Sequence, residues 1–303
     1  MVEPRRGVIP PQPRRPERRR PPRGTVVRRR LVAVGVLLAA VIGVGFAIAS
    51  VGGGSGKHKP ATTAVAAPKP FRIIFPEGFT RADMADRVQK VAKIAAQERG
   101  RKPRLSKAAY LAATARPRAL PGFGRRPLEG FLFPATYDFT ARTPARRLVA
   151  NQVAAFRRNW RGVSLAYARS KNLTPYDVLT IASMIEKEAV APDERAKVAR
   201  VVYNRLHLGM TLGIDATIRY GLHVPGTESL RESQLQSDNP YNTRTRAGLP
   251  PTPIASPGLA SLQAAAHPIA GKWLYFVRKP DKVHHFFTDS LSEFNAYKAA
   301  HGF

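Results

Sequence analysis

A run of 20 residues without charge, from 31 to 50, constrains the possible folds of this chain more than any other feature. It is rich in Leu, Val, Ile and Ala, and about 20 such residues in a helix cross the hydrocarbon of a bilayer. Arg28, Arg29 and Arg30 stand directly before the run. Because positive charge flanks the cytoplasmic end of such helices, the sequence predicts a single-pass plasma (inner) membrane anchor with residues 1–30 in the cytoplasm. Everything after the anchor is then extracytoplasmic.

A cleaved signal peptide is the alternative, because Ala47-Ile48-Ala49 has the small residues of a cleavage site. The apolar core of a signal peptide usually has about 7–15 residues, and this run is longer, which favours a retained transmembrane helix. Residues 1–30 contain eleven Arg, two Glu and many prolines, so we expect a disordered basic tail that orients the anchor. Binding of nucleic acid by this tail is the weaker alternative.

The composition narrows the classes of function. The chain has 50 Lys and Arg against 20 Asp and Glu, a net charge of +30, and no cysteine. The lack of cysteine excludes disulfides, thiolate metal sites and a cysteine nucleophile. The histidines lack the spacing of metal ligands and no phosphate-binding loop is present, so we expect no metal and no cofactor. A basic exported domain suits an anionic partner such as a cell-wall polymer, and we expect no nucleic acid there.

The globular part follows a linker. Residues 51–70 are rich in Gly, Ala and Pro, which is typical of a flexible tether. Residues 71–140 predict a small α/β subdomain that starts with a short strand at 72–75. A helix is expected after Thr80, whose spacing to an acid three positions later is that of a capping box, and a second helix after Ser106.

An aromatic segment at 128–137 contains Glu129. Aromatic side chains stack on sugar rings, but packing in a core is their commoner use. Glu129 could be a carboxylate of a binding site or an ordinary buried or loop glutamate.

The segment 174–189 carries the strongest chemical signal. Thr174 and Pro175 predict the start of a helix, and apolar residues follow at helical spacing. Glu186 and Glu188 flank this apolar stripe about 160° apart, so only one of them can enter a narrow cleft. A carboxyl group at an apolar border is partly desolvated, which raises its pKa as a general acid for glycosidic cleavage requires. Two ordinary solvated glutamates are the alternative.

The rest of the chain predicts a helix at 193–208, a short helix at 261–266 and a buried strand at 274–277 that pairs with 284–288. Residues 215–221 and 238–243 are interpreted as irregular segments. They bring together the hydroxyl, amide and ring groups that sugar sites use, although plain surface loops have the same composition.

Together these motifs resemble the MltG (YceG-like) family of endolytic murein transglycosylases over residues 71–303. The matching segments are 128–134 (LEGFLFP), 182–188 (ASMIEKE), 202–206 (VYNRL), 215–217 (DAT), 241–243 (YNT), 248–251 (GLPP), 257–258 (PG) and 274–277 (LYFV). Several motifs in one order are more specific than any one of them.

The resemblance implies an α+β fold with a LysM-like glycan-binding subdomain at 71–140 and an α+β catalytic domain at 141–303. It implies cleavage of the β-1,4 bond between N-acetylmuramic acid (MurNAc) and N-acetylglucosamine (GlcNAc) in nascent peptidoglycan, which leaves 1,6-anhydroMurNAc ends. Glu186 is the implied general acid, which then acts as a base. Wall synthases are the implied protein partners.

The residues expected to bind substrate are Glu129, Asn204, Asp215, Thr217, Tyr241, Asn242 and Thr243. Two other functions stay open. One is a lysozyme-type hydrolase that uses Glu186 with a second carboxylate, Asp215 or Asp238. The other is a non-catalytic, membrane-anchored protein that binds the cell wall.

Overall fold

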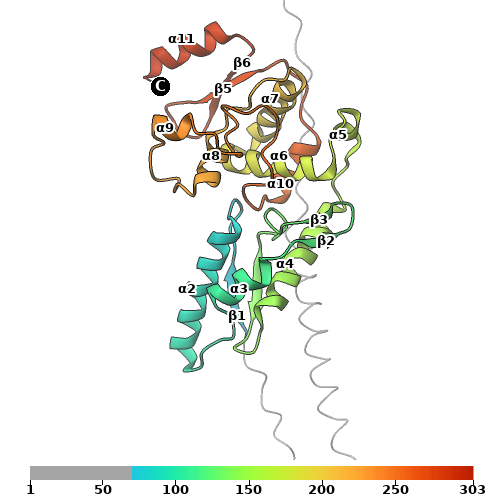
Figure 1. The fold of residues 1–303 in the computed structure, drawn as a ribbon, viewed down its shortest axis with the longest axis vertical. Helices are drawn as coiled ribbons and strands as arrows, with labels where there is room; N and C mark the ends of the chain where they lie inside the picture. The colour runs from blue at the N-terminus through green and yellow to red at the C-terminus, as the bar shows by residue number, and fades with distance from the viewer. Residues whose placement is uncertain (1–69, 303) are drawn as a thin grey trace, which may run out of the picture. The chain divides into compact units, whose positions relative to one another are not determined.

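A computed structural model describes residues 70–302 of the chain (Figure 1). The expected cytoplasmic tail, the transmembrane helix at 31–50 and nearly all of the linker lie outside the described residues. Between residues 70 and 302, no helix has both the length and the apolar character needed to cross a membrane.

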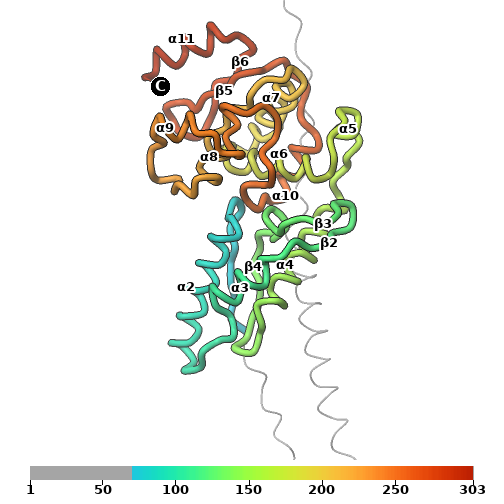
Figure 2. Tube along the Cα trace, viewed as in Figure 1, coloured from blue at the N-terminus to red at the C-terminus, as the bar shows by residue number. Residues whose placement is uncertain are grey.

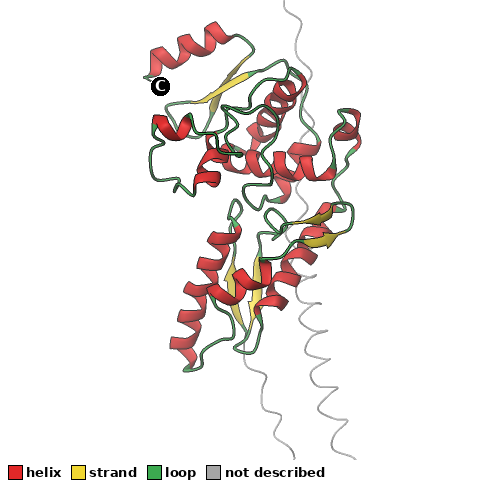
Figure 3. Ribbon diagram, viewed as in Figure 1, coloured by secondary structure: helices red, strands yellow, loops and turns green. Residues whose placement is uncertain are grey.

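The first module runs from residue 70 to 160 and combines helices with short strand pairs (Figure 3). Its elements are β1 (Phe71–Ile74), α2 (Arg81–Arg99), α3 (Lys107–Thr114), β2 (Arg118–Leu120), β3 (Gly124–Arg126), β4 (Thr136–Phe139) and α4 (Ala145–Trp160). β1 pairs antiparallel with β4, and β2 pairs with β3. α3 packs between α2 and α4 (Figure 2). Because α4 also contacts β4, the expected domain boundary at residue 140 falls inside this packed set of elements.

Both helices expected in this module begin at the predicted caps. The Thr80 hydroxyl accepts a hydrogen bond from the backbone N–H of Asp83, and the Asp83 carboxylate accepts one from the N–H of Thr80. Ser106 caps α3 by accepting from the N–H of Ala109. Such caps satisfy backbone donors that a helix start leaves unpaired.

The second module follows from residue 161. Its elements are α5 (Ala166–Ser170), α6 (Pro175–Glu188), a 3₁₀ turn (Pro192–Glu194), α7 (Arg195–His207), α8 (Asp215–Leu222), α9 (Glu232–Leu235), α10 (Leu259–Ala266), β5 (Tyr275–Arg278), β6 (His285–Thr288) and α11 (Leu291–His301). α6 packs against α7, α8 and α10. Every residue from Val178 to Ile185 is buried, so the helix is apolar on more sides than the single predicted stripe. With three antiparallel strand pairs among helices in residues 70–302, the predicted α+β class is confirmed.

α6 starts as the sequence predicts. Thr174 and Asp177 form a reciprocal capping box, and Pro175 occupies the first turn, where its missing N–H is not needed. The last turn of α6 carries the two glutamates of the Glu-Lys-Glu motif, which places them where the helix leaves the core.

The aromatic segment before β4 lies in the core rather than on a sugar-binding surface. Phe131 contacts Phe123 edge-on with ring centroids 4.9 Å apart and Phe156 at 5.0 Å. Leu128, Phe131 and Leu132 expose 1% or less of their surface. These rings therefore attach the segment, and Glu129 within it, to α4.

Three expectations about local structure were wrong. Residues 215–221 form the helix α8 instead of an irregular segment, because the Thr217 hydroxyl donates to the Ile214 carbonyl oxygen and pins the first turn. The helix expected from residue 193 begins at Arg195, after a 3₁₀ turn that starts at Pro192. The strand at 275–278 is half-buried rather than buried, since it belongs to a sheet of only two strands.

Candidate active site

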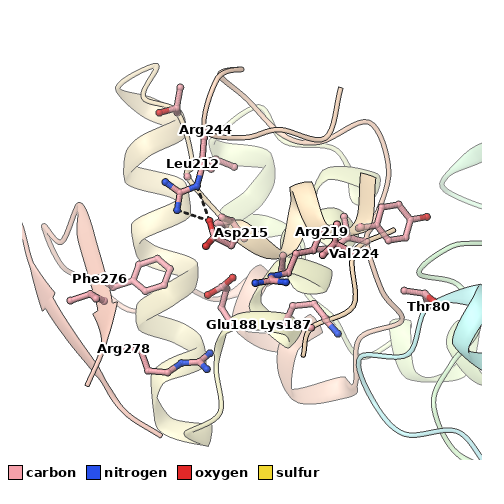
Figure 4. A pocket seen from close by; sticks show the side chains of 18 of the residues that line it. Thr80, Lys187, Glu188, Leu212, Asp215, Arg219, Val224, Arg244, Phe276 and Arg278 are labelled. Atoms are coloured by element: carbon pink, nitrogen blue, oxygen red, sulfur yellow. Dashed lines mark hydrogen bonds and ion pairs between the residues drawn. The ribbon is translucent and has the colours of Figure 1, made fainter. Parts of the chain in front are cut away.

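A cavity of about 1200 Å³ lies among α6, α8, the β5–β6 hairpin and the first turn of α2 (Figure 4). Pockets for drug-sized ligands hold about 300–1,000 Å³, so this one has room for several sugar rings. Its basic lining residues are Arg81, Lys187, Arg205, Arg219, Arg244, Arg278 and Lys298, and its acidic ones are Asp83, Glu129, Glu188 and Asp215. The cationic groups outnumber the carboxyl groups, which suits a substrate that carries negative charge.

Glu188, the last residue of α6, is the glutamate of the motif that lines this cavity. Figure 4 shows its carboxyl group below Asp215, with Phe276 and Arg278 on one side and Lys187 on the other. Burial raises the pKa of Glu188 to about 7, and the negative charge of Asp215 adds to the rise.

Positive charge on the cavity wall opposes that rise. Arg278 lowers the pKa of Glu188 most, followed by a backbone hydrogen bond from Ala216 at the start of α8 and then by Arg244. The balance leaves about half of the Glu188 side chains protonated near pH 7. A carboxyl group in this state can donate a proton and afterwards accept one.

Glu186 has a different environment. Its Oε2 accepts a 2.9 Å hydrogen bond from the backbone N–H of Gly258, and it is not among the residues that line the cavity. Its charge helps to raise the pKa of Glu77, for which burial is the larger cause. The contact with Gly258 attaches α6 to the loop before α10. The catalytic role expected for Glu186 stays a prediction, and the cavity supplies no geometry for it.

Glu129 is a second buried carboxyl group on the cavity wall, with 6% of its surface exposed. Both of its oxygens accept from the backbone N–H of Arg81, at 3.0 and 3.2 Å, and Oε2 also accepts from the Tyr220 hydroxyl at 3.0 Å. Burial raises the pKa of Glu129 to about 7, and the hydrogen bonds from Arg81 and Tyr220 oppose the rise.

Asp215, at the N-terminus of α8, lines the cavity beside Glu188. Arg244 holds it with Nε at 2.7 Å and Nη2 at 2.5 Å from the same carboxylate oxygen, Oδ1. This pairing keeps a negative charge close to Glu188. Asp238 forms an ion pair with Arg246 and does not line the cavity.

The other residues expected to bind substrate do not line the cavity and hold the second module together. Thr217 and Thr243 are buried and share a 2.9 Å hydrogen bond between their hydroxyl groups. Asn242 is buried and donates to the carbonyl oxygens of Leu235 and Ser237. Binding of substrate by these residues stays a prediction.

Asn204 and Tyr241 also make internal contacts. Asn204 donates to the carbonyl oxygens of Gly271 and Trp273, and the Tyr241 hydroxyl pairs with that of Thr252. Neither Asn204 nor Tyr241 is among the residues that line the cavity.

Phe276 and Arg278 line the cavity, yet sequence reasoning missed them. They lie two positions apart on β5, so their side chains share one face of the hairpin. Successive side chains of a strand point to opposite faces, so the sequence could have paired Phe276 with Arg278. Nothing in the sequence indicated which of the two faces meets Glu188. Within residues 70–302, no group of acidic, His or Cys side chains could hold a metal ion.

Comparison with known proteins adds to this geometry. A sequence model of the YceG-like family matches residues 57–300. A Bacillus subtilis (strain 168) protein named endolytic murein transglycosylase is 35% identical over 176 residues, which cover 57% of this chain and 48% of that protein. A Streptococcus pneumoniae (strain ATCC BAA-255 / R6) protein of the same name is 38% identical over 156 residues, covering 50% of this chain and 28% of that protein. The chain thus spans about half or less of the length of these curated relatives.

A solved structure is similar as well. The crystal structure of a YceG-like protein from Listeria monocytogenes matches with a TM-score of 0.56 at 30% identity, covering 75% of this chain and 76% of that one. The mixed α+β architecture is therefore shared with that protein.

Proposed function

Because the chain belongs to the YceG-like family, we propose that it is an endolytic murein transglycosylase. Its substrate is the peptidoglycan glycan strand, cleaved internally at the MurNAc–GlcNAc β-1,4 bond to leave a 1,6-anhydroMurNAc end. The names of the two relatives support the activity. The observation that carries the chemistry is Glu188, a carboxyl group with a pKa of about 7 on the wall of a cavity large enough for several sugars.

Glu188 takes the role of the general acid in this proposal, in place of Glu186. The protonated carboxyl group donates to the glycosidic oxygen as the bond to C1 of MurNAc breaks and positive charge develops on the ring. The carboxylate that remains accepts the proton of the C6 hydroxyl of the same sugar, whose oxygen then bonds to C1. Protons balance, and the enzyme returns to its starting state.

One protein carboxyl group suffices for this sequence of steps. The C6 hydroxyl belongs to the substrate, and a well-oriented intramolecular nucleophile has an effective concentration on the order of 10⁵ M or more. Asp215 contributes in another way, because its negative charge favours the protonated form of Glu188 and would also stabilise positive charge on the sugar.

The rest of the chain fits the same proposal. The first module, in which β1 pairs with β4 and the helices α2 and α3 lie between them in the sequence, would act as the LysM-like glycan-binding part. The uncharged run at 31–50 would anchor the enzyme in the plasma membrane with the cavity outside, where nascent strands are made. Wall synthases are the partners that this location favours.

Hydrolysis is the second candidate, and one observation favours it. Asp215 stands beside Glu188 on the cavity wall, and lysozyme-type enzymes use two carboxyl groups near the scissile bond. Two nitrogen atoms of Arg244 contact Oδ1 of Asp215 and compete with substrate for this oxygen, so we rank this mechanism second.

The test is digestion of purified peptidoglycan followed by mass spectrometry of the soluble products. We expect 1,6-anhydroMurNAc ends from the wild type, no soluble products from Glu188→Gln, and wild-type products from the neighbouring control Glu186→Gln. Ends with reducing MurNAc would establish hydrolysis instead. Activity that survives in Glu188→Gln but disappears in Glu186→Gln would refute the choice of acid.

A further inference from the structure

A buried pair of titratable side chains lies at the edge of the cavity and has no role in the mechanism above. Nδ1 of His285 is 2.7 Å from Oε2 of Glu194, and the backbone N–H of His285 donates to both oxygens of that carboxylate at 3.0 and 3.1 Å. The side chains of His285 and Glu194 expose 2% and 5% of their surface. A single carboxylate therefore holds both the backbone and the ring of His285.

The geometry decides what each ring nitrogen can do. Glu194 presents its oxygens as acceptors to the backbone N–H of His285, so we assign the proton of the ring contact to Nδ1 of His285. In the Nδ1–H tautomer Nε2 is an acceptor whose lone pair Glu194 does not use. Nε2 has no hydrogen-bond partner among residues 70–302, and it is not among the fully enclosed side-chain atoms that lack one. His285 lines the cavity, and we take Nε2, its ring nitrogen without a partner in the protein, as the atom that faces the cavity.

The position of His285 in the hairpin places it close to the reacting centre. His285 pairs directly with Arg278 across the two strands, so their side chains lie on the same face. Arg278 influences the pKa of Glu188, which shows that this face of the hairpin meets the general acid. The His285 ring also meets Phe276 edge-on, with ring centroids 5.5 Å apart.

We propose that Nε2 of His285 binds the glycan by accepting a hydrogen bond from a sugar hydroxyl group in the cavity, with Glu194 as its positioning residue. The proposal rests on the proposed function, since it takes the ligand of the cavity to be a polysaccharide. The Lys and Arg side chains of the cavity wall only donate hydrogen bonds, so an imidazole nitrogen adds an acceptor for sugar hydroxyl groups to those that the carboxyl groups of the wall provide. The positioning residue Glu194 lies 91 positions away from His285 in the sequence.

Two substitutions separate glycan binding from a purely structural role. The side-chain amide nitrogen of Asn can occupy the place of Nδ1 of a histidine. His285→Asn therefore keeps a hydrogen-bond donor for Glu194 and removes the acceptor at Nε2. The amide of Gln coincides with Nε2, so His285→Gln keeps a polar group at the cavity and deletes the donor for Glu194. Both variants are made in the 303-residue chain that also carries Glu188→Gln, so that the glycan is not consumed.

The measurement is the Kd for soluble, uncrosslinked peptidoglycan oligosaccharides by calorimetry, with the Tm as a control for folding. We expect His285→Asn to raise Kd about five- to tenfold with little change in Tm. His285→Gln should lower Tm and leave the Kd of the folded protein within about twofold of the parent. An unchanged Kd in His285→Asn overturns the proposal. If that variant does not fold, a His285→Gln protein that has lost glycan affinity overturns it instead.

This outcome is independent of the choice of acid. Residual cleavage by the Glu188→Gln parent would refute the proposed role of Glu188 and leave the comparison of Kd values intact. A parent that does not bind the oligosaccharides at all would refute both the glycan cavity and the role of His285.

Discussion

The hydroxyl group of Tyr220 donates a 3.0 Å hydrogen bond to Oε2 of Glu129, which lies 91 positions earlier in the chain. The same carboxyl group accepts from the first turn of α2 through the N–H of Arg81. Three segments that are distant in sequence thus meet at one buried carboxyl group on the cavity wall. The cavity therefore depends on this junction as well as on the helix that carries Glu188.

Tyr220→Phe should destabilise the protein by about 1–3 kcal/mol, because it removes a hydrogen bond to a buried, ionisable group. Urea unfolding measures the change. Tyr241→Phe is the matched control, since the Tyr241 hydroxyl bonds only to the neutral hydroxyl of Thr252 and its removal should cost about 1 kcal/mol. If Tyr220→Phe and Tyr241→Phe lost the same unfolding free energy, the hydrogen bond to the Glu129 carboxyl group would be no stronger than one to a neutral hydroxyl group.

Glu129→Gln should flatten the dependence of stability on pH. The folded-state pKa of Glu129 is raised from 4.5 to about 7, so its contribution to stability is complete below pH 4.5 and is lost as the pH rises through 7. The shift corresponds to at most about 3 kcal/mol. Unfolding free energies at pH 5 and pH 8 should differ less in Glu129→Gln than in the wild type or in the exposed control Glu228→Gln. If the unfolding free energies of Glu129→Gln at pH 5 and pH 8 differed as much as those of the wild type, Glu129 would not have the raised pKa.

The rate of glycan cleavage should fall as the pH rises above about 7, because the general acid must be protonated and the pKa of Glu188 is about 7. Well above that pH the rate should drop about tenfold per pH unit. Solubilisation of labelled peptidoglycan at a series of pH values gives the profile. A flat profile from pH 6 to 9 would rule out Glu188 as the acid.

Asp215→Asn should move that falling limb to lower pH, since the charge of Asp215 raises the pKa of Glu188. Arg278→Gln should move it to higher pH, since the charge of Arg278 lowers the same pKa. The two shifts in opposite directions are the diagnostic result of the profile experiment. Shifts in one direction for both variants would point to a change of structure rather than of charge.

Gly130→Ala should destabilise the protein by about 1–3 kcal/mol more than Gly122→Ala. Both glycines have positive φ, +84° and +82°, so alanine is strained at either position. A Cβ at Gly130 would lie 2.7 Å from Cβ of Pro253, whereas nothing lies within 4 Å of one at Gly122. Thermal unfolding of the two variants isolates the cost of overpacking, and similar Tm values would show that the Pro253 loop moves aside.

Local signals in the sequence predicted the starts of α2, α3 and α6 correctly, because caps depend on residues three positions apart. The same local signals could not show which of Glu186 and Glu188 lines the cavity. Both glutamates border the apolar stripe of α6, and what covers each border is set elsewhere in the chain. The loop at Gly258 covers one, and Asp215 and the β5–β6 hairpin surround the other.

The expected binding residues show the same limit. Asn242 and Thr243 have the polar groups that sugar sites use, but those groups satisfy backbone partners in the second module. A polar side chain in a short motif does not reveal whether its partner will be substrate or protein. Glu129 and Asp215 line the cavity from the starts of the aromatic segment and of α8, so their place depends on how these two segments pack.

The two glutamates of α6 lie on different sides of the helix, and this has a consequence for how such a gene can change. A substitution between Thr174 and Glu188 alters one contact, but deletion of a single residue there would rotate the whole last turn by about 100°. Glu188 would then take the exposed position of Lys187, and Glu186 the buried position of Ile185, while every residue of the motif was still present. Viable descendants of this gene should accumulate replacements in α6 and conserve its length.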